Sequence, residues 1–424
     1  MFTLHPQAER ALNMLRQNGF EAYLVGGCVR DFLLGVEPKD YDLTTSARPE
    51  EVKIVFSGFR TLDTGIRHGT VTVMMEQIPL EITTYRVEGG YSDARHPDSV
   101  RFTDSLRQDV SRRDFTMNAV AYAPWEGIMD YFGGAEDIDK RLIRCVGDPN
   151  RRFQEDALRI LRAVRFASVL GFSLEQETAK AALQNQKLLD RVSAERIAGE
   201  LTKLLCGRNA GKVFEQFYPI LRAVLPELPA AGPSPETVEA LRRVEPVPAR
   251  RWAVLFWRVG TSSASAALER LKVSRELREE TVTLLGFCGE PVPVDRIGVR
   301  QLISRLGETM FFDLLAVHRA AFSAGNGLKE GETVHFDEIE TIAREILCSG
   351  ACLTVGQLDI RGTDLIRRGF RGREIGRMLT VLLEAVLAEK TENQKENLLI
   401  YAEKYRLSSE FFTENPERGE TFTS

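Results

Sequence analysis

The sequence lacks any run of apolar residues close to the ~18 that a membrane-spanning helix requires. Its first ten residues also lack the basic-then-apolar order of a secretion signal. Hydrophobic residues make up 43% and charged residues 28%, which is ordinary globular usage and argues against fibrous or mainly disordered classes. We therefore expect a soluble, cytoplasmic protein without a membrane segment, and 424 residues are enough for more than one domain.

Cysteine and histidine are scarce, and neither forms a metal or redox pattern. The six cysteines are scattered singly apart from one CxxxC pair, which argues against disulfides and a zinc site. The five histidines form no HExxH motif, and no GxxxxGK[ST] phosphate loop is present. We interpret His68 as a turn or sheet-packing residue. The chain therefore lacks the signatures of metallohydrolases, serine hydrolases and P-loop nucleotide binders.

A net positive charge is also absent. The 56 lysines and arginines are outnumbered by 61 acids, a formal charge of −5, so the average field repels a polyanion. Two segments depart from this average. Residues 151–165 hold five arginines against two acids, and residues 356–377 hold six arginines against three acids, each a formal +3. Any binding of nucleic acid must depend on such local basic segments.

The pattern of apolar residues changes near residue 150. Short runs typical of strands occupy the front, and we expect them to form one sheet covered by helices; they lie at 22–25, 71–74, 80–85 and 142–146. Apolar residues then recur at helical spacing from Leu158 to about Lys404. Proline-rich breaks at 228–235 and 290–295 separate helical modules, and residues 408–424 are expected to be disordered. The predicted fold class is α+β.

Two adjacent glycines, Gly26 and Gly27, follow the first apolar run and precede a predicted helix that carries Arg30. Without Cβ atoms, glycines let backbone N–H groups approach a phosphate, and the arginine adds a charge-assisted contact. A merely structural turn explains the glycine pair equally well.

Asp40 and Asp42 are two residues apart, so on a strand both carboxylates leave the same face. Two oxygen ligands on one face suit Mg²⁺ when the ion also holds substrate phosphates. Chance also produces this spacing in a chain with 61 acids. The nearby glycine pair and a further strand acid, Glu81, favour a three-carboxylate metal site. For Glu81, an exposed strand acid is nearly as good an explanation.

The triplet Arg112-Arg113-Asp114 has two interpretations. Most such triplets are surface ion pairs. The functional interpretation makes Arg113 a nucleotide contact.

Asp156 and Arg159 are expected on the first long helix, three residues apart and therefore neighbours on its surface, followed by Arg162 and Arg165. A surface salt bridge is the default interpretation. The pair also has a chemically specific use, because aspartate only accepts hydrogen bonds and arginine only donates them.

Cytosine and adenine both present an amine donor beside a ring-nitrogen acceptor, whereas uracil and guanine reverse that order. One Asp/Arg pair therefore accepts C and A and rejects U and G, at about 1 to 3 kcal/mol for each unmatched polar group. Such a pair would act as a template made of protein.

Five motifs, in order and with matching spacing, resemble the class II tRNA nucleotidyltransferases, the CCA-adding enzymes. They are Leu24-Val-Gly-Gly-Cys-Val-Arg-Asp31, Asp40-Tyr-Asp42, Arg112-Arg-Asp-Phe-Thr-Met-Asn-Ala119, Glu155-Asp-Ala-Leu-Arg159 and Ser193-Ala-Glu-Arg-Ile197. The segment Asp359-Ile-Arg-Gly-Thr-Asp-Leu365 is similar to the tail of the bacterial enzymes, so the resemblance covers nearly the whole chain.

The resemblance implies a polymerase-β-like nucleotidyltransferase head, then an all-helical neck, body and tail. We assign these to residues 1–147, 148–207, 208–292 and 293–407. It also implies transfer of C, C and A from CTP and ATP to the 3′ end of tRNA, with release of pyrophosphate. The rear domains would hold the acceptor arm of the tRNA through its shape and phosphates. The sequence indicates no oligomeric state.

The resemblance further implies roles for single residues. Asp40 and Asp42 would bind Mg²⁺, with Glu81 as a less securely aligned third acid. The triphosphate would lie against the glycine turn and Arg30. The rest of the nucleotide pocket would be formed by Arg113, Asp156, Arg159, Arg162 and Arg165.

Three alternatives to a CCA-adding enzyme remain open: an A-adding enzyme, a poly(A) polymerase and a non-catalytic protein. CC-only relatives have a shortened loop before the Arg-Arg-Asp motif, whereas residues 87–98 here look full length, which favours an enzyme able to add the final A. A strictly A-adding enzyme and bacterial poly(A) polymerase share the same head motifs. Outside the class, the chain would be a non-catalytic RNA-binding protein, against which the intact Asp40 and Asp42 argue.

Overall fold

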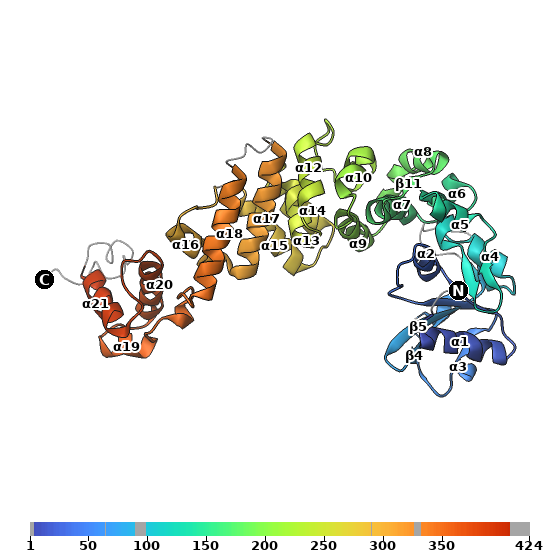
Figure 1. Cartoon of the computed structure of the whole chain (residues 1–424), viewed down its shortest axis with the longest axis horizontal. Coiled ribbons are helices and arrows are strands. Elements are labelled where there is room, and N and C mark those ends of the chain that lie inside the picture. The colour runs from blue at the N-terminus through green and yellow to red at the C-terminus, as the bar shows by residue number, and fades with distance from the viewer. Residues whose placement is uncertain (1–3, 64, 90–98, 290, 326–331, 408–424) are drawn as a thin grey trace. The chain divides into compact units, whose positions relative to one another are not determined.

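A computed structural model describes residues 4–63, 65–89, 99–289, 291–325 and 332–407. The chain forms two compact units, Met1–Arg278 and Glu279–Ser424 (Figure 1). The predicted disorder of residues 408–424, and most of the loop predicted at 87–98, lie outside the described residues. No helix within the described ranges combines the length and the hydropathy that crossing a membrane requires.

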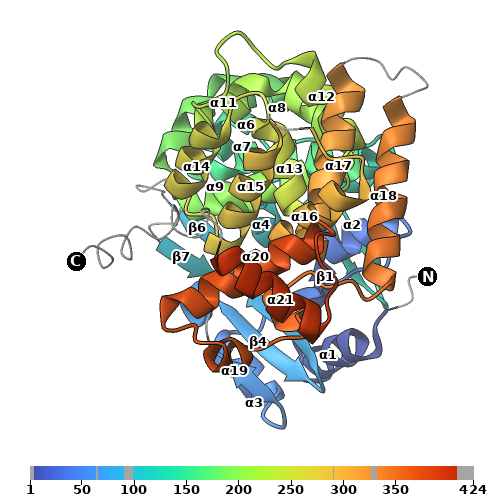
Figure 2. The ribbon, with the colours of Figure 1, turned by 90° about the vertical axis from the view of Figure 1, so that its left-hand side faces the viewer.

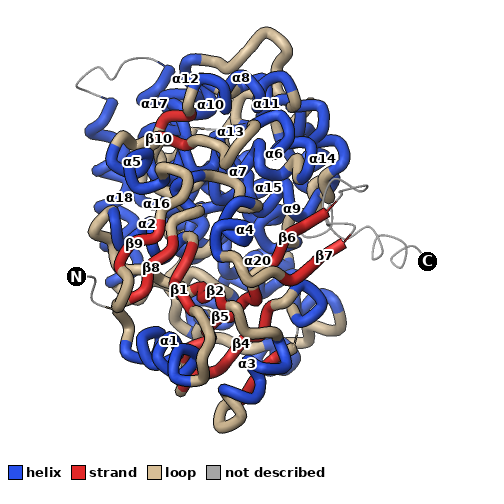
Figure 3. The backbone as a smooth tube through the Cα atoms, turned by 90° about the vertical axis from the view of Figure 1, so that its right-hand side faces the viewer, coloured by secondary structure: helices blue, strands red, loops and turns tan. Residues whose placement is uncertain are grey.

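A seven-stranded sheet, ordered β3-β4-β5-β2-β1-β8-β9, forms the front of the first unit. Its strands are β1 (Ala22–Val25), β2 (Asp42–Thr45), β3 (Arg60–Leu62), β4 (Thr70–Met75), β5 (Ile78–Thr84), β8 (Ala121–Ala123) and β9 (Gly127–Met129). Only β2 and β5 pair in parallel, and the other neighbours are antiparallel. Figure 3 shows β1, β2, β5 and β4 side by side. The strands predicted at 22–25, 71–74 and 80–85 are confirmed.

Strand β1 is buried on both faces, whereas β4 and β5 alternate between buried and more exposed residues. Leu24 packs into the core that α1 (Pro6–Gln17) and α3 (Pro49–Val55) cover, and Figure 2 shows these helices near β4. Tyr23 and Val25 enter a second core, which includes Leu106 and Val110 of α4 (Leu106–Ser111). Strand β1 is thereby packed from both sides.

The predicted fourth strand, 142–146, does not join this sheet. Only β10 (Leu142–Ile143) is extended there, and it pairs in parallel with β11 (Ser173–Leu174) as a separate two-stranded sheet. The apolar run is buried against α7 (Leu158–Leu170) instead of against the large sheet. A third small sheet is the hairpin of β6 (Arg86–Gly89) and β7 (Ser99–Phe102).

Short helices connect these strands. They are α2 (Gly27–Leu33), η1 (Ile66–His68), η2 (Thr116–Asn118) and α5 (Gly134–Asp139). His68 therefore ends a single turn, as predicted.

Helices make up nearly all of the first unit after residue 148. They are α6 (Pro149–Glu155), α7, α8 (Gln176–Gln184), η3 (Gln186–Arg191), α9 (Ala194–Leu205), α10 (Ala210–Gln216), α11 (Tyr218–Val224), α12 (Pro235–Arg243), α13 (Pro248–Phe256), α14 (Thr261–Arg270) and α15 (Arg275–Phe287), which runs on into the second unit. The apolar positions that predicted α7, including Leu158, Leu161 and Val164, are buried.

The second unit is helical throughout its described residues. It contains α16 (Arg296–Leu306), α17 (Glu308–Gly325), α18 (Glu332–Cys348), η4 (Val355–Gln357), α19 (Gly362–Arg367), α20 (Arg373–Leu387) and α21 (Lys395–Arg406). A core that includes Leu365, Met378 and Leu398 joins the last three helices.

Candidate active site

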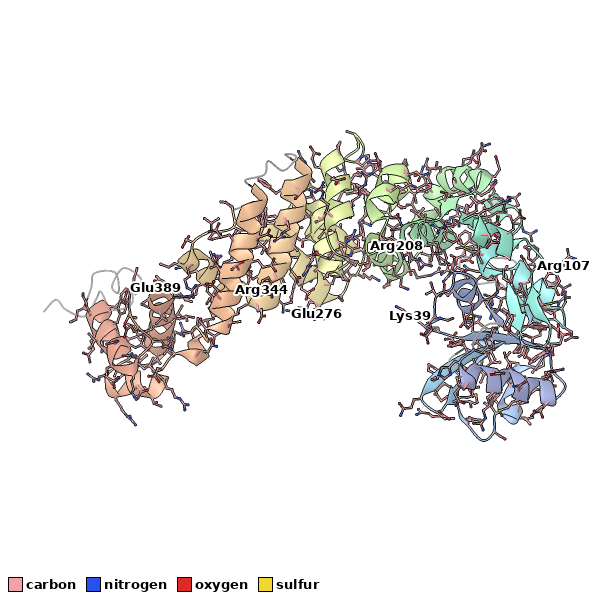
Figure 4. All side chains as sticks on the ribbon, in the orientation of Figure 1. Lys39, Arg107, Arg208, Glu276, Arg344 and Glu389 are labelled. Carbon is pink, nitrogen blue, oxygen red and sulfur yellow. The ribbon has the colours of Figure 1, made fainter. Side chains whose placement is uncertain are left out.

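Two acids stand side by side on the parallel strand pair. Asp42 begins β2, and its register partner on β5 is Glu81. Register partners point to the same face of a sheet, so these carboxylates share one face. Asp40 lies before β2, and the prediction that one strand carries both aspartates is therefore wrong. The strand starts late because the chain still bends at Lys39, which Figure 4 labels on the segment between α2 and β2.

The three acids are close enough to affect one another. Burial raises the pKa of Asp42 above its ordinary value, Arg113 opposes this shift, and the Glu81 and Asp40 carboxylates add to it. Mutual repulsion of this kind is relieved by a cation. Mg²⁺ commonly takes one or two carboxylates and completes its shell with water and substrate phosphate, so the residues present fit such an ion. The described residues contain no group of three or more His, Cys, Asp or Glu side chains arranged as a finished metal site.

The backbone at Gly26 lies directly against this acidic face. Gly26 has φ +83°, a conformation that residues with a Cβ rarely adopt. A Cβ placed there would lie 3.0 Å from Nη1 of Arg113 and 3.8 Å from Oδ2 of Asp42. The glycine therefore lets the chain turn beside both side chains. At Gly27, the first residue of α2, the position of a Cβ is 3.6 Å from Nη2 of Arg30.

The members of the Arg112-Arg113-Asp114 triplet pair with other parts of the chain. Arg112 forms an ion pair with Asp109 at 2.9 Å. Burial lowers the pKa of Arg113, and its Nε has no hydrogen-bond partner in the described structure. A buried guanidinium with unused donors is suited to an anionic ligand. The interpretation of the triplet as a surface ion pair is not supported.

A chain of polar contacts connects α2 of the head to α7. Arg30 Nη2 lies 2.7 Å from Asp31, and Arg30 Nη1 donates to Oδ1 of Asn118 at 3.0 Å. The Asn118 amide then donates to Oδ1 of Asp114 at 3.0 Å. The other oxygen of Asp114 accepts from Nε of Arg162 at 2.8 Å. Burial alone would raise the pKa of Asp114, but Arg162 and Asn118 together lower it to about 2.

The prediction that Asp156 and Arg159 share one long helix is wrong. Asp156 ends α6 in an extended conformation, with φ −141° and ψ 104°, and α7 begins at Leu158. Its Oδ1 accepts from the backbone N–H of Leu158 at 3.1 Å, and its Oδ2 accepts from Arg196 of α9 at 2.8 Å. This capping role explains the break, because an aspartate satisfies N–H groups at a helix start.

Arg159 is also held by residues other than Asp156. Its Nη1 lies 2.9 Å from Glu155, and its Nη2 donates to the carbonyl oxygen of Arg112 at 3.0 Å. Only 11% of its side chain is exposed. The default interpretation of the two residues as a surface salt bridge is therefore not supported, and neighbouring elements fix each of them separately.

Sequence reasoning missed the residues that support the predicted ones. Arg165 forms an ion pair with Glu200 of α9 at 2.5 Å, and Phe166 lies under several arginines. Asn118 and Arg196 each lie within a quoted motif, but nothing in their spacing indicated a partner 40 or more residues away. Taken together, the site combines an acidic face that fits a divalent cation with buried arginines that fit a polyanion.

Models of known families match three parts of the chain. The poly A polymerase head domain matches residues 22–144. An RNA and SrmB binding site of polymerase A matches 171–231, and tRNA nucleotidyltransferase domain 2 matches 248–402.

Whole-chain relatives agree with these matches. The chain is 37% identical over 411 residues to the CCA-adding enzyme of Geobacillus thermodenitrificans, with 93% of this chain and 96% of the relative covered. It is 35% identical over 414 residues to the CCA-adding enzyme of Lactobacillus helveticus, with 94% and 96% covered. The crystal structure of the Bacillus stearothermophilus CCA-adding enzyme in complex with CTP matches with a TM-score of 0.76 and 31% identity, over 95% of this chain and 98% of that one.

Proposed function

The chain belongs to the family of CCA-adding enzymes, and from this premise we propose how its residues carry out the reaction. The enzyme is a nucleotidyltransferase that adds C, C and A to the 3′ end of tRNA from CTP and ATP without a nucleic-acid template. In each cycle, the 3′ oxygen of tRNA forms a bond to the α-phosphorus, the bond to the β-phosphate bridge breaks, and pyrophosphate leaves.

We assign the divalent metal that this family implies to Asp42 and Asp40, and we propose that it is Mg²⁺. When bound, such an ion supplies positive charge at the reacting phosphate and favours the deprotonated 3′ hydroxyl. The chain's own contribution is a pair of carboxylates held beside the glycine turn, with Asp42 anchored at the start of a buried strand. Glu81 lies in register with Asp42 and is the third acid of this assignment.

The triphosphate would lie along the arginines that face this cluster. Arg113 is directly beside Gly26 and Asp42, and Arg30 lies beside Gly27. Arg162 and Arg165 approach from α7. Preorganised positive groups stabilise charge that develops on a transferring phosphoryl group, because they need no reorientation during the reaction. In this proposal the arginines bind the triphosphate, and the remaining pocket residues orient the nucleotide.

Base selection is assigned to Asp156 and Arg159. Because Arg196 and the start of α7 fix Asp156, its acceptors keep one orientation. Because Glu155 and the Arg112 carbonyl oxygen fix Arg159, its N–H donors also keep one orientation. A fixed acceptor and a fixed donor match the edges of cytosine and adenine, and leave uracil and guanine with unmatched groups.

The parts of the chain divide this work as follows in our proposal. Residues 1–147 form the catalytic head, 148–207 the neck that selects the nucleotide, 208–292 the body and 293–407 the tail that holds the tRNA. The tail's exposed arginines, including Arg367 and Arg371, suit phosphate contacts with the acceptor arm. We propose that the enzyme works in the cytoplasm, together with its tRNA and nucleotide substrates.

The observation that carries the proposal is the convergence of Asp42, Arg113 and the Gly26 backbone at one point. The test is incubation of the purified protein with tRNA that lacks its 3′ end and with labelled CTP or ATP. Incorporation of two C residues and one A is the expected result. Transfer of A alone onto tRNA ending in CC would identify an A-adding enzyme, and long A tails on unrelated RNA would identify a poly(A) polymerase.

A further inference from the structure

One aromatic ring lies among three of the four arginines assigned to the triphosphate. The Cζ atoms of Arg165, Arg30 and Arg162 lie 3.8, 5.3 and 5.5 Å from the centroid of the Phe166 ring. Phe166 is only 5% exposed, and Phe115 packs edge-on against it at 5.8 Å between centroids. Nothing in the reaction described above requires an aromatic residue at this position.

The three arginines come from two parts of the molecule and have separate acidic partners. Arg30 lies on α2 of the head and pairs with Asp31. Arg162 and Arg165 lie on α7 and pair with Asp114 and Glu200. Asn118 and Asp114 also connect Arg30 to Arg162 through hydrogen bonds, and both Asp114 and Glu200 attract Arg162 and Arg165. What all three share is the Phe166 ring.

Three cations that gather before any anion is bound repel one another. The face of a benzene ring carries partial negative charge, and a guanidinium within about 6 Å of its centroid is attracted by about 0.5 to 2 kcal/mol. Burial strengthens this attraction, since water screens it less. In the absence of nucleotide, Phe166 therefore adds an attraction that acts on all three arginines, beside the polar contacts through Asn118 and Asp114.

We propose that Phe166 is a positioning residue that prearranges Arg30, Arg162 and Arg165 for the triphosphate of the incoming nucleotide. This inference rests on the proposed function. Because CTP and ATP carry the same triphosphate, the residue acts on both nucleotides alike. It leaves base selection to Asp156 and Arg159, which do not lie over this ring in the described structure.

The first test replaces Phe166 by leucine, which keeps an apolar side chain and removes the ring. We expect the KM for CTP and for ATP to rise together by about tenfold, from the loss of more than one cation–π contact. The KM for tRNA and the ratio of CTP to UTP use should stay within twofold of the wild type. Phe166→Tyr keeps the ring face and should restore nucleotide KM to within about twofold.

Phe172→Leu is the matched control. Phe172 is also 5% exposed and follows the same helix, but no guanidinium stacks on its ring in the part of the chain that the structure describes. Its replacement should lower thermal stability by as much as Phe166→Leu and leave nucleotide KM unchanged. An equal rise of nucleotide KM in both leucine variants would overturn the proposal, because it would show a general packing effect.

Fluorinated phenylalanines at position 166 keep the shape of the ring and weaken its negative face stepwise, so the variants fold even where leucine does not. CTP binding measured by calorimetry without tRNA should weaken with each added fluorine, and a flat series would overturn the proposal. Transfer by the wild-type enzyme is scored separately. If the wild type transfers no nucleotide, the proposed function fails, whereas transfer with a flat fluorine series removes only the role of Phe166.

Discussion

The two basic segments, 151–165 and 356–377, carry the same formal charge of +3 and place most of it in different surroundings. In the first, Arg152, Arg159 and Arg165 have only 11 to 14% of their side chains exposed, and each has an acidic partner within 3.0 Å. The other two arginines of this segment are more exposed, Arg162 at 34% and Arg151 at 75%. In the second, the side chains of Arg367 and Arg368 are 79% and 50% exposed. Equal charge in the sequence therefore does not mean equal use.

The buried and the exposed arginines suit different ligands. Buried, paired arginines keep one geometry and suit a small ligand whose charges have fixed positions. Exposed arginines are screened by salt and attract a long polyanion through their summed charge. We therefore expect changes in the first segment to affect nucleotide choice and chemistry, and changes in the second to affect tRNA affinity.

The largest effect should come from Asp42→Ala, which removes one of the two carboxylates that we assign to the metal and leaves both basic segments intact. Transfer should fall by about a thousandfold or more, since the reacting phosphate loses its metal-borne charge. Binding of tRNA, measured by filter retention, should stay within a few-fold of the wild type. Loss of tRNA binding together with activity would mean that the carboxylate is structural and that the two regions are not independent.

A smaller effect is expected from Arg159→Ala, which removes the hydrogen-bond donors of the pair that we propose reads the base. The preference for CTP over UTP should fall by about 10- to 100-fold, because unmatched polar groups cost about 1 to 3 kcal/mol each. Competition between labelled CTP and UTP measures it. The KM for tRNA serves as the internal control, and it should not change. An unaltered preference would contradict the assignment of base reading to this segment.

The next prediction concerns stability and pH. Asp114 has a pKa lowered from 3.8 to about 2 in the folded chain. Because the folded pKa is the lower one, the carboxylate stabilises the fold fully above about pH 4, and this contribution is lost as pH falls toward 2. Asp114→Asn should therefore cost on the order of 2 kcal/mol near pH 7 and almost nothing near pH 2. Urea unfolding at several pH values checks this, and a constant difference would refute the role of the Arg162 pair.

The smallest effect per residue is expected in the tail. Arg367→Gln should weaken tRNA binding only a few-fold and reduce the slope of log affinity against log salt by about 0.7 to 0.9, which is one phosphate contact. Stability should change by less than about 0.5 kcal/mol. Arg344→Gln is the matched control, because Arg344 is 65% exposed on α18, outside the segment, and pairs with a neighbouring acid as Arg367 does. Equal slopes for the two variants would contradict a tRNA contact made by the segment 356–377.

Several helices and strands, and part of the candidate site, could be predicted from local sequence patterns. Alternating and helical spacings predicted β1, β4, β5 and α7, because each element buries the apolar residues that define its period. The spacing of Asp40 and Asp42 indicated nearby carboxylates but placed Asp40 on a strand that begins only at Asp42.

Long-range pairing was not predictable in the same way. The helix expected through Asp156 is broken, because Arg196 of a later helix and the start of α7 both use its carboxylate. The apolar run at 142–146 satisfied the pattern of a strand, but its partner is β11 and not the large sheet. A single sequence carries no signal for such partners, since they depend on which distant element arrives at the same place.

We propose that one fixed site selects cytosine and adenine beside a metal-binding face, without a nucleic-acid template. The test mixes the purified enzyme and Mg²⁺ with tRNA that ends at its discriminator base. Each of the four labelled nucleotides is then added, alone and in mixtures, and its incorporation is measured. We expect that CTP alone extends the tRNA by two residues, that CTP with ATP extends it by three, and that UTP and GTP add nothing. Equal incorporation of all four nucleotides, or none of any, would contradict it.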